Sequence, residues 1–285
     1  MRKTFAVLGG DLRQLRLAQL LEQDGQIVYR YGFDQEPEQS SLERAVTADV
    51  VILPLPISKD GHTLYLPFST ATIALEDLWP FLDSRRQLVC GGNLQEPLRQ
   101  QASEAGVNLT DYFCREDVRI GNAVPTAEGA IQTAMEVTET TLHGVRALVT
   151  GYGRIGKVLA QDLRGLGAET VVSARKFRDA ALADALGFCT LNTEALSGHL
   201  GAFDLIFNTV PAVILDRARL AELKSSCIVI DLASEPGGVD FAAAEELGVR
   251  VIWAKGLPGK VAPLSAAKVI HNAIYHILEE RGEPI

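Results

Sequence analysis

A glycine-rich turn at residues 151–156, Gly-Tyr-Gly-Arg-Ile-Gly, follows the apolar stretch Ala147–Thr150 and leads into a helical pattern. Gly151 allows a sharp turn, Gly153 lets a pyrophosphate approach the backbone, and Gly156 lets the helix pack close to the strand. The free N–H groups at the start of such a helix then hold the negative charge of a phosphate. Strand, glycines and helix together predict a site for a nicotinamide or flavin dinucleotide, and therefore hydride chemistry; the alternative is a turn with a structural role only.

The residues after the next predicted strand indicate which dinucleotide is bound. In an NAD site an Asp or Glu, about 20 residues beyond the glycines, binds the 2′-hydroxyl of the adenosine ribose. Here the strand predicted at Thr170–Ser173 is followed by Ala174, Arg175 and Lys176, so that acid is missing. A hydroxyl and two cations suit a 2′-phosphate, because arginine grips phosphate with two hydrogen bonds and stacks on adenine. We therefore expect NADP rather than NAD; the alternative is a solvated basic loop.

Two more strand ends are expected beside the glycine turn, because the carboxyl ends of parallel strands share one edge of a sheet. The loop Asn208–Pro211 ends one strand, and in similar folds such a loop passes the nicotinamide ribose. The stretch Leu232–Ser234 ends the next strand and is expected to face the nicotinamide. The predicted cofactor residues are Gly151, Gly153, Arg154, Ile155, Gly156, Ser173, Arg175, Lys176, Asn208, Thr209, Val210, Pro211, Leu232 and Ala233.

Three charged residues are candidates for holding a substrate. Lys260 follows the last predicted strand in a loop, Gly256–Lys260, and ligands of parallel sheets bind beyond the carboxyl ends of the strands. Arg13, after the turn of the first strand, could clamp a carboxylate with two hydrogen bonds. Asp11 beside it could orient Arg13 or act as a base. The alternatives are a solvated loop lysine, a surface arginine and a helix-capping aspartate.

His62 and Glu128 complete the catalytic candidates. His62 lies in a polar loop after another predicted strand, where a histidine could act as a general acid or base near neutral pH. Glu128 stands in the first turn of a helix predicted over 126–142, and the N-terminus of that helix would favour an anion. The alternatives are an incidental loop histidine and a glutamate that only complements the helix dipole.

The composition of the chain excludes several classes of protein. Its 285 residues suffice for two domains, and 47% hydrophobic with 22% charged residues is ordinary for a globular protein. The net charge of −9 argues against nucleic acid and against an anionic membrane surface as partners. No apolar run approaches the roughly 18–20 residues of a membrane-spanning helix. The four cysteines form no metal pattern or disulfide framework, so we expect a cytoplasmic protein without a metal.

Apolar stretches of strand length alternate with helical patterns, which predicts the α/β class. We expect two Rossmann-like domains, each a doubly wound parallel sheet, joined by crossover helices. Residues 1–125 would form a substrate domain, and 126–264 an NADP-binding domain that includes the bridging helix 126–142, capped by Thr126. A last helix over 265–285, whose apolar positions recur at helical spacing, is expected to pack back on the first domain.

The individual elements follow from the same patterns. The other predicted helices are Leu12–Gln23, Leu75–Asp83 and Gln95–Ala105. The predicted strands are Thr4–Leu8, Gln26–Tyr31, Asp49–Leu53, Gln87–Cys90, Ala147–Thr150, Thr170–Ser173, Leu205–Asn208, Ile228–Leu232 and Val249–Trp253.

Several motifs carry a family resemblance. They are Gly9-Gly10-Asp11-x-Arg13-Gln14, Leu53-Pro54-Leu55-Pro56, Asn122-x-x-Pro125-Thr126-Ala127-Glu128-Gly129-Ala130, Asn208-Thr209-Val210-Pro211, Asp231-Leu232-Ala233-Ser234-x-Pro236-Gly237-Gly238-x-Asp240-Phe241 and Leu257-Pro258-Gly259-Lys260-Val261-Ala262-Pro263. With the glycine turn, they resemble the A subunit of dipicolinate synthase over essentially the whole chain. The last two motifs are the most specific, whereas the glycine pattern is generic.

This resemblance implies formation of dipicolinate, pyridine-2,6-dicarboxylate, from 4-hydroxy-tetrahydrodipicolinate, an intermediate of lysine biosynthesis, during sporulation. It also implies a small dicarboxylate as substrate, a partner that is the flavodoxin-like B subunit, and the mother-cell cytoplasm of a spore-forming bacterium. The family is similar in layout to formate and alanine dehydrogenases and to the D-2-hydroxyacid dehydrogenases. We further expect an oligomer.

Three functions remain open from the sequence. The first is an NADP-dependent oxidoreductase subunit that forms dipicolinate with a B subunit. The second is a stand-alone amino-acid or 2-oxoacid dehydrogenase resembling alanine dehydrogenase. The missing ribose acid argues against it, as does the absence of a His–Glu or His–Asp pair placed like that of the hydroxyacid dehydrogenases. The third is a non-catalytic subunit that binds a dinucleotide only to hold or regulate its partner.

Overall fold

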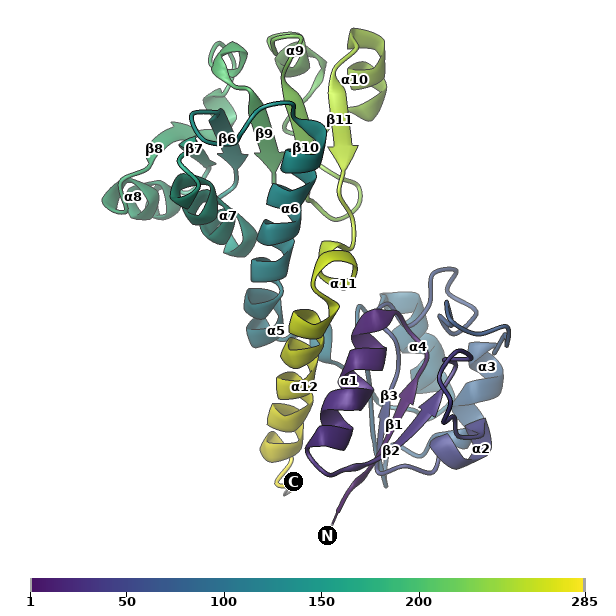
Figure 1. Ribbon diagram of the computed structural model, residues 1–285. Helices are drawn as coiled ribbons and strands as arrows, with labels where there is room; N and C mark the ends of the chain where they lie inside the picture. The colour runs from purple at the N-terminus through teal and green to yellow at the C-terminus, as the bar shows by residue number, and fades with distance from the viewer. Residues whose placement is uncertain (1, 284–285) are drawn as a thin grey trace. The chain divides into compact units, whose positions relative to one another are not determined.

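The computed structural model describes residues 2–283 and divides them into two compact units (Figure 1). Unit 1 contains residues 2–122 together with the C-terminal segment from Ala262, and unit 2 is Ala123–Val261. Each unit is built around one parallel sheet, so the predicted α/β class with two doubly wound sheets is confirmed. None of the helices in residues 2–283 is long and apolar enough to cross a membrane.

Unit 1 has a five-stranded parallel sheet in the order β2-β1-β3-β4-β5. Its strands are β1 Thr4–Leu8, β2 Ile27–Tyr31, β3 Val50–Ile52, β4 Leu88–Gly91 and β5 Leu109–Asp111. Its helices are α1 Leu12–Gln23, α2 Leu42–Ala45, α3 Leu75–Leu78, α4 Glu96–Glu104, α5 Glu116–Gly121 and α12 Pro263–Glu280, with short 3₁₀ helices at Trp79–Phe81 and Tyr112–Cys114.

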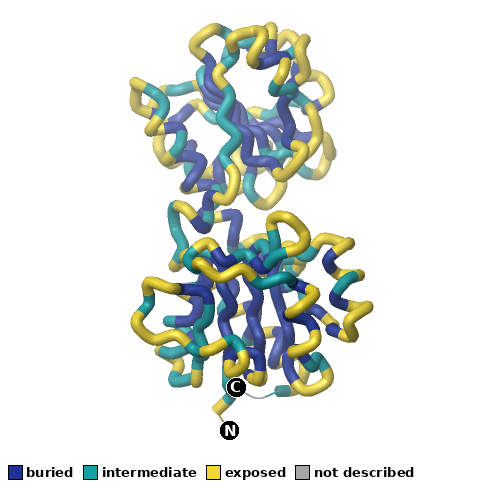
Figure 2. The backbone as a smooth tube through the Cα atoms, turned by 90° about the vertical axis from the view of Figure 1, so that its right-hand side faces the viewer, coloured by how far each residue is buried: buried dark blue, intermediate teal, exposed yellow. Residues whose placement is uncertain are grey.

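Alternate residues of β1 face the two sides of this sheet, as the pleat of a strand requires. Phe5 and Val7 pack with the apolar faces of α1 and α12, whereas Ala6 and Leu8 pack on the other side among residues that include Trp79. The strands β1, β3 and β4 are therefore buried on both faces, and Figure 2 shows dark blue strands in this sheet. This two-sided burial explains why these three strands are nearly continuous apolar runs.

Unit 2 has a six-stranded parallel sheet in the order β11-β10-β9-β6-β7-β8. Its strands are β6 Arg146–Thr150, β7 Glu169–Ala174, β8 Cys189–Asn192, β9 Leu205–Asn208, β10 Ile228–Asp231 and β11 Arg250–Trp253. Its helices are α6 Ala123–Val137, α7 Arg154–Gly165, α8 Phe177–Ala185, α9 Arg217–Leu220, α10 Phe241–Leu247 and α11 Leu257–Val261, with 3₁₀ helices at Thr193–Ala195 and Leu200–Ala202.

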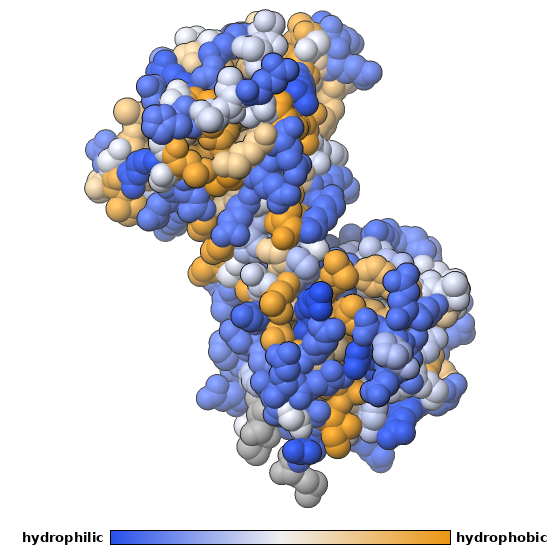
Figure 3. Space-filling view, in the orientation of Figure 1, coloured by the Kyte–Doolittle hydropathy of each residue, from blue (hydrophilic) through white to orange (hydrophobic). Residues whose placement is uncertain are grey.

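Two apolar clusters cover the two faces of the unit 2 sheet. Val149 and Phe207 point to the side of α6 and α7, while Leu148 and Ile206 point to the side of α9 and α10. The surface of both units is mainly hydrophilic, with apolar side chains gathered in separate patches (Figure 3).

The bridging helix differs from its prediction over 126–142. The helix α6 begins at Ala123 and ends at Val137. Pro125 is tolerated near its start because the first N–H groups of a helix have no intrahelical acceptor. At the other end, the backbone N–H and Oγ1 of Thr138 both donate to the carbonyl of Ala134, at 3.0 Å and 2.9 Å, just beyond the last helical residue. Thr126 consequently lies inside α6 and does not cap it.

Two strands, β5 and β8, were absent from the sequence prediction. Each is the last strand at one edge of its sheet and is short. The residues of β8 are half-buried or exposed, so no apolar run marks it. An edge strand of this kind forms because its neighbour offers a free row of backbone groups, a property that local sequence does not record.

One cluster on α12 ties that helix to the end of α1. Tyr275 Oη donates to Asp24 Oδ2 at 2.7 Å, and His271 Nε2 lies 2.7 Å from the same oxygen. The hydrogen bond from Tyr275 is the largest cause that lowers the pKa of Asp24, with a further contribution from His271 against an opposing effect of burial.

Replacing Tyr275 by Phe should therefore destabilise unit 1 by about 0.5–1.5 kcal/mol at pH 7, near the lower end because Asp24 is partly exposed. A carboxyl group whose folded-state pKa is lowered stabilises the fold above its unfolded pKa and loses that contribution as pH falls through the folded pKa. The difference between variant and wild type should thus shrink below about pH 4. Urea unfolding in a Trp253→Phe background, followed by Trp79 fluorescence, measures it.

The matched control is Tyr29→Phe, because the Tyr29 hydroxyl has no hydrogen-bond partner within residues 2–283. An equal loss of stability at pH 7 and pH 3 would show that the Asp24 cluster does not act through its carboxylate.

Candidate active site

The glycine turn has the geometry that a phosphate-binding turn requires. Gly151 has φ +85°, a conformation that residues with a Cβ rarely adopt, and its N–H donates to the carbonyl of Ser173 at 2.9 Å. A Cβ on Gly156 would lie 2.0 Å from the carbonyl oxygen of Gly151, so only glycine fits there. Gly153 is the N-cap of α7, and a Cβ built on it meets no atom within 4 Å. The space beside Gly153 is thus open, and this glycine has no side chain that could cap α7.

A buried carboxylate connects the loops that follow β9 and β10. Asp231 is fully buried, and its Oδ1 accepts hydrogen bonds from Asn208 Nδ2 at 2.8 Å and from the N–H of Ala233 at 3.0 Å. Its Oδ2 accepts from the N–H of Gly238 at 2.8 Å. The two carboxylate oxygens of Asp231 therefore hold both ends of the Leu232–Gly238 loop and connect this loop to Asn208 at the end of β9.

Asn208 extends the hydrogen-bond network of Asp231 to β6, the strand before the glycine turn. Its Oδ1 accepts from Thr150 Oγ1 at 2.6 Å and from the N–H of Val210 at 3.1 Å. Thr209 Oγ1 donates to the carbonyl of Thr150 at 2.8 Å. Three strand ends, those of β6, β9 and β10, are consequently held in one arrangement.

Asp231 is a positioning residue that the sequence prediction of the site did not include. The available signal was an acid at the end of the apolar stretch Ile228–Asp231, since a carboxylate buried among apolar residues needs hydrogen-bond donors around it. Of the predicted cofactor residues, Asn208 ends β9 and is bonded to this carboxylate, and Leu232 and Ala233 lie on the loop that it holds.

The basic loop after β7 presents its two cations to solvent. Arg175 and Lys176 are exposed, and Lys176 is the N-cap of α8. Ser173 is fully buried below them, where its Oγ accepts a hydrogen bond from Thr193 Oγ1 at 3.1 Å. Phe177, the next residue, is 90% exposed. The surface of this loop therefore consists of two cations and an aromatic ring.

In unit 1 the structure joins Asp11 and Arg13. Asp11 caps α1 through the N–H of Arg13 at 3.0 Å, and its Oδ2 accepts from Arg13 Nη2 at 2.8 Å. Nη2 also donates to the carbonyl of Leu55 at 2.8 Å, and Arg13 is only 9% exposed. Within residues 2–283, Nη1 has no hydrogen-bond partner, so one edge of the guanidinium remains available.

Behind Arg13 lies a second buried polar pair. Gln14 Nε2 contacts the hydroxyl of Tyr112 at 3.4 Å, and Gln14 Oε1 is buried without a hydrogen-bond partner in the described part of the chain. Burial is the main cause that raises the pKa of Tyr112 far above its usual value. The phenol is thus neutral and acts as a fixed hydroxyl.

His62 lies on an exposed loop that Asp60 organises. The carboxylate of Asp60 accepts from the N–H groups of His62 and Thr63, both at 2.8 Å, and from Thr63 Oγ1 at 2.6 Å. These bonds, led by the Thr63 hydroxyl, hold the pKa of Asp60 well below its usual range. The segment after this loop is hydrogen-bonded to the turn that follows β1, where the N–H of Gly10 donates to the carbonyl of Tyr65 at 2.9 Å. His62 itself is exposed.

Lys260 and Glu128 lie on helices of unit 2. For both residues the local structure differs from the one predicted. Lys260 is exposed on the short helix α11 and not in a loop, because Gly256–Val261 folds into one turn that packs on α6. Glu128 is exposed on α6 but beyond its first turn, because the helix begins at Ala123. Burial, with a smaller effect of the Glu128 charge, raises the pKa of Asp162 on α7.

The four cysteines are all free, and no cluster of metal-binding side chains occurs in the described residues. Cys90 and Cys227 are buried, and burial raises the pKa of each thiol to about 12. Neither is therefore a thiolate near neutral pH.

Fold and glycine turn define an α/β protein with the layout of alanine and D-2-hydroxyacid dehydrogenases. Residues 113–238 match the family described as "D-isomer specific 2-hydroxyacid dehydrogenase, NAD binding domain". An L-alanine dehydrogenase structure superposes with a TM-score of 0.68 at 15% identity, over 98% of this chain and 90% of that one. At this identity the likeness concerns the fold alone.

The chain belongs to the family of dipicolinate synthase A subunits. Residues 4–113 match the family of N-terminal domains of these A subunits. The chain is 32% identical over 290 residues to the A subunit of dipicolinate synthase from Bacillus subtilis strain 168, covering 97% of this chain and 96% of the relative. The crystal structure of the dipicolinate synthase A subunit from Bacillus halodurans has a TM-score of 0.90 at 31% identity, with 97% of each chain covered. The predicted family resemblance is thereby confirmed.

Replacing Asp231 by Asn should loosen the loops that face the glycine turn. The new NH₂ group would oppose an N–H donor in a buried site, which costs about 1–3 kcal/mol. Amide hydrogen exchange at Ala233 and Gly238 should accelerate about tenfold or more, because their acceptor is lost or weakened. Exchange followed by mass spectrometry measures this change.

Asp184→Asn on α8 is the matched control, because Asp184 is exposed and has no side-chain hydrogen bond in the described residues. Unchanged protection at both amides in the Asp231 variant would contradict the positioning role.

Proposed function

We propose that this chain is an NADP-dependent oxidoreductase subunit that forms dipicolinate from 4-hydroxy-tetrahydrodipicolinate. The reaction removes one molecule of water and then two hydrogens, one as hydride and one as proton, to give the aromatic pyridine ring. The observation that carries the proposal is the full-length relationship to the A subunit of dipicolinate synthase, together with an open glycine turn at the N-terminus of α7.

Unit 2 has the features that a dinucleotide requires. The pyrophosphate would lie at Gly151–Gly156, and the positions of Gly153 and Gly156 leave the room that a Cβ would take. When bound, NADP⁺ supplies a hydride acceptor at its nicotinamide ring. The exposed cations Arg175 and Lys176 would hold the 2′-phosphate, because no acid ends β7 to bind a ribose hydroxyl.

Unit 1 is the proposed substrate domain, corresponding to residues 1–125 of the predicted division, with 126–264 as the NADP-binding domain. The free edge of Arg13 would bind one substrate carboxylate while Asp11 holds the guanidinium in place. Lys260 would bind the second carboxylate. His62 and Glu128 would be the acid and base for loss of water.

The assembly and setting of the reaction are part of the same proposal. The word "subunit" in the name of the B. subtilis relative supports a complex of more than one chain. We propose that a flavodoxin-like B subunit is the partner and that the complex works in the mother-cell cytoplasm of a sporulating bacterium.

Replacing Arg175 and Lys176 together by Ala should weaken binding of NADP⁺ about tenfold to several hundredfold, because two charge-assisted hydrogen bonds to the 2′-phosphate are lost. Binding of NAD⁺ should change less than about threefold, since NAD⁺ has no 2′-phosphate. Titration calorimetry with both dinucleotides measures the two affinities.

Arg178→Ala is the control for general loss of charge, because Arg178 is exposed on the same helix and pairs with its neighbour Asp179. An equal loss for the two dinucleotides would rule out a 2′-phosphate clamp.

The proposed reaction is tested by turnover of freshly generated 4-hydroxy-tetrahydrodipicolinate with NADP⁺, using this chain alone and with a flavodoxin-like B subunit. We expect dipicolinate and NADPH in equal amounts, each followed by its ultraviolet absorbance. Dipicolinate without NADPH would assign the redox step elsewhere and leave this chain with a binding role only. No dipicolinate in either mixture would contradict the proposal and favour a stand-alone dehydrogenase of another substrate.

A further inference from the structure

Unit 2 contains a cavity at the edge of its sheet opposite the glycine turn. Arg146 and Cys189 are the first residues of β6 and β8, and Phe203 lies just before β9. The glycine turn follows the other end of β6, so about 13 Å of strand separates the two places. The cavity has a volume of about 330 Å³, which is at the lower end of the range for small-molecule sites.

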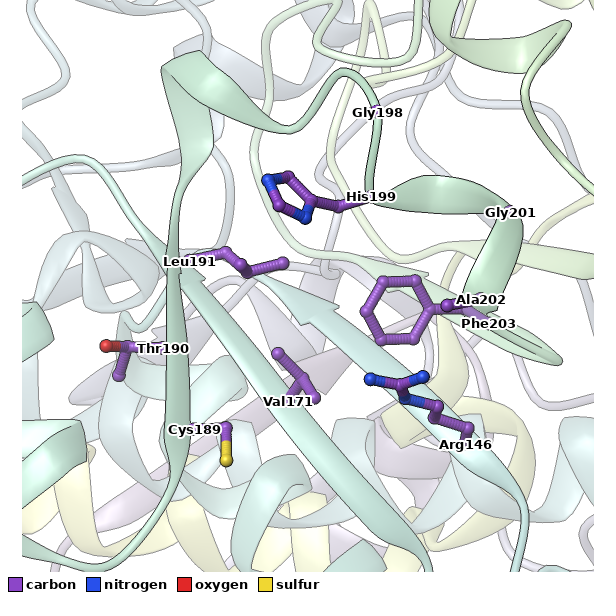
Figure 4. Close-up of a pocket in the computed structure, with 10 residues that line it drawn as sticks. All are labelled: Arg146, Val171, Cys189, Thr190, Leu191, Gly198, His199, Gly201, Ala202 and Phe203. Carbon is purple, nitrogen blue, oxygen red and sulfur yellow. The ribbon is translucent and has the colours of Figure 1, made fainter.

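The lining of this cavity combines an apolar floor with a cation. Val171 and Leu191 form the floor, and the buried ring of Phe203 forms one wall. In Figure 4 the side chains of these residues, Arg146 and His199 surround the same space. No α-helix of the described chain lines the cavity; the segment with the 3₁₀ helices at Thr193–Ala195 and Leu200–Ala202 runs beside it.

Arg146 has a cation that no acid of the described chain neutralises by direct contact. Its guanidinium carbon lies 5.5 Å from the centre of the Phe203 ring, and no ion pair of its side chain occurs within residues 2–283. The nearby carboxylate of Asp204 feels the charge of Arg146, which helps to lower the pKa of Asp204, but it makes its hydrogen bonds to other groups. It accepts from Lys224 Nζ at 2.6 Å and from the backbone N–H of Arg146 at 2.9 Å. An arginine held on an aromatic face with a free edge is suited to a carboxylate.

We propose that this cavity is a second small-molecule site of unit 2, separate from the dinucleotide site, and that it takes an aromatic carboxylate. The ring would lie on Val171 and Leu191 against Phe203, and the carboxylate would accept two hydrogen bonds from Arg146. His199 can donate a ring N–H to the same ligand. The apolar floor selects the ring, and the cation of Arg146 selects the charge.

Cys189 makes the proposal testable without an activity assay. Of the four cysteines only Cys114 and Cys189 are exposed, and Cys189 lines the cavity whereas Cys114 lies in unit 1. Alkylation of each by iodoacetamide can be followed by peptide mass spectrometry on the intact chain. Benzoate at saturation should slow the labelling of Cys189 at least about threefold and leave Cys114 unchanged. Benzamide, which has the same shape without the charge, should protect much less.

The Arg146→Met variant should raise the benzoate concentration for half protection at least about tenfold, because the variant keeps the apolar stem and loses both charge-assisted hydrogen bonds. Its affinity for NADP⁺ should be unchanged, which separates this site from the proposed dinucleotide site. Arg86→Met, a change at an exposed arginine of unit 1, is the matched control and should leave protection intact. The proposal is overturned if benzoate leaves the labelling of Cys189 unchanged, slows both cysteines alike, or protects Arg146→Met as well as the wild type.

Discussion

Asp231 is a fully buried carboxylate whose partners are all N–H donors, two from the backbone and one from Asn208. A charge removed from water is tolerated only while such donors stay in place. Formation of the carboxylate site and ordering of the loops after β9 and β10 are therefore the same event. Because Asn208 also accepts from Thr150, the strand that leads into the glycine turn belongs to the same network. The proposed cofactor site thus has a rigid edge before any ligand arrives.

The two units have the same type of fold but differ at the turn between the first strand and the first helix of each sheet. In unit 2, the N-cap of α7 is Gly153, which has no side chain and so places no charge of its own at the start of the helix. In unit 1, Asp11 caps α1 with its own carboxylate, and Arg13 neutralises that carboxylate. A phosphate at the start of α1 would have to displace the Asp11 carboxylate, which already accepts from the N–H of Arg13. This difference explains physically why only unit 2 is proposed to hold the dinucleotide, while unit 1 contributes cationic and polar groups.

Central elements of both sheets could be predicted closely because their residues are buried on two faces. Two strands have the bounds that their apolar patterns predict, Thr4–Leu8 and Leu205–Asn208. The same is true of one helix that packs on a sheet, Leu12–Gln23. The edge strands β5 and β8 could not be predicted in this way, because they form by pairing with a neighbouring strand and no apolar run marks them. The bounds of α6 were missed because Pro125 fits inside a first helical turn as well as before one.

The candidate site was only partly accessible to sequence reasoning. The glycine turn could be predicted because its steric requirements act on three residues that are close in sequence. Asp231 was overlooked because its role depends on donors from Asn208 and Gly238, which are brought to it by strand order and loop closure. The free side of Arg13 likewise follows from the distant carbonyl of Leu55 that fixes the rest of its guanidinium.

The most direct test of the central claim is the fate of the hydrogen that leaves the substrate ring. Substrate deuterated at its ring carbons would be converted with NADP⁺ by the protein together with the proposed B subunit, and the mass of the reduced dinucleotide would be measured by mass spectrometry. Direct hydride transfer on this chain predicts one deuterium in each NADPH formed. NADPH without deuterium, or dipicolinate formed with the deuterium lost entirely to water, would contradict the account.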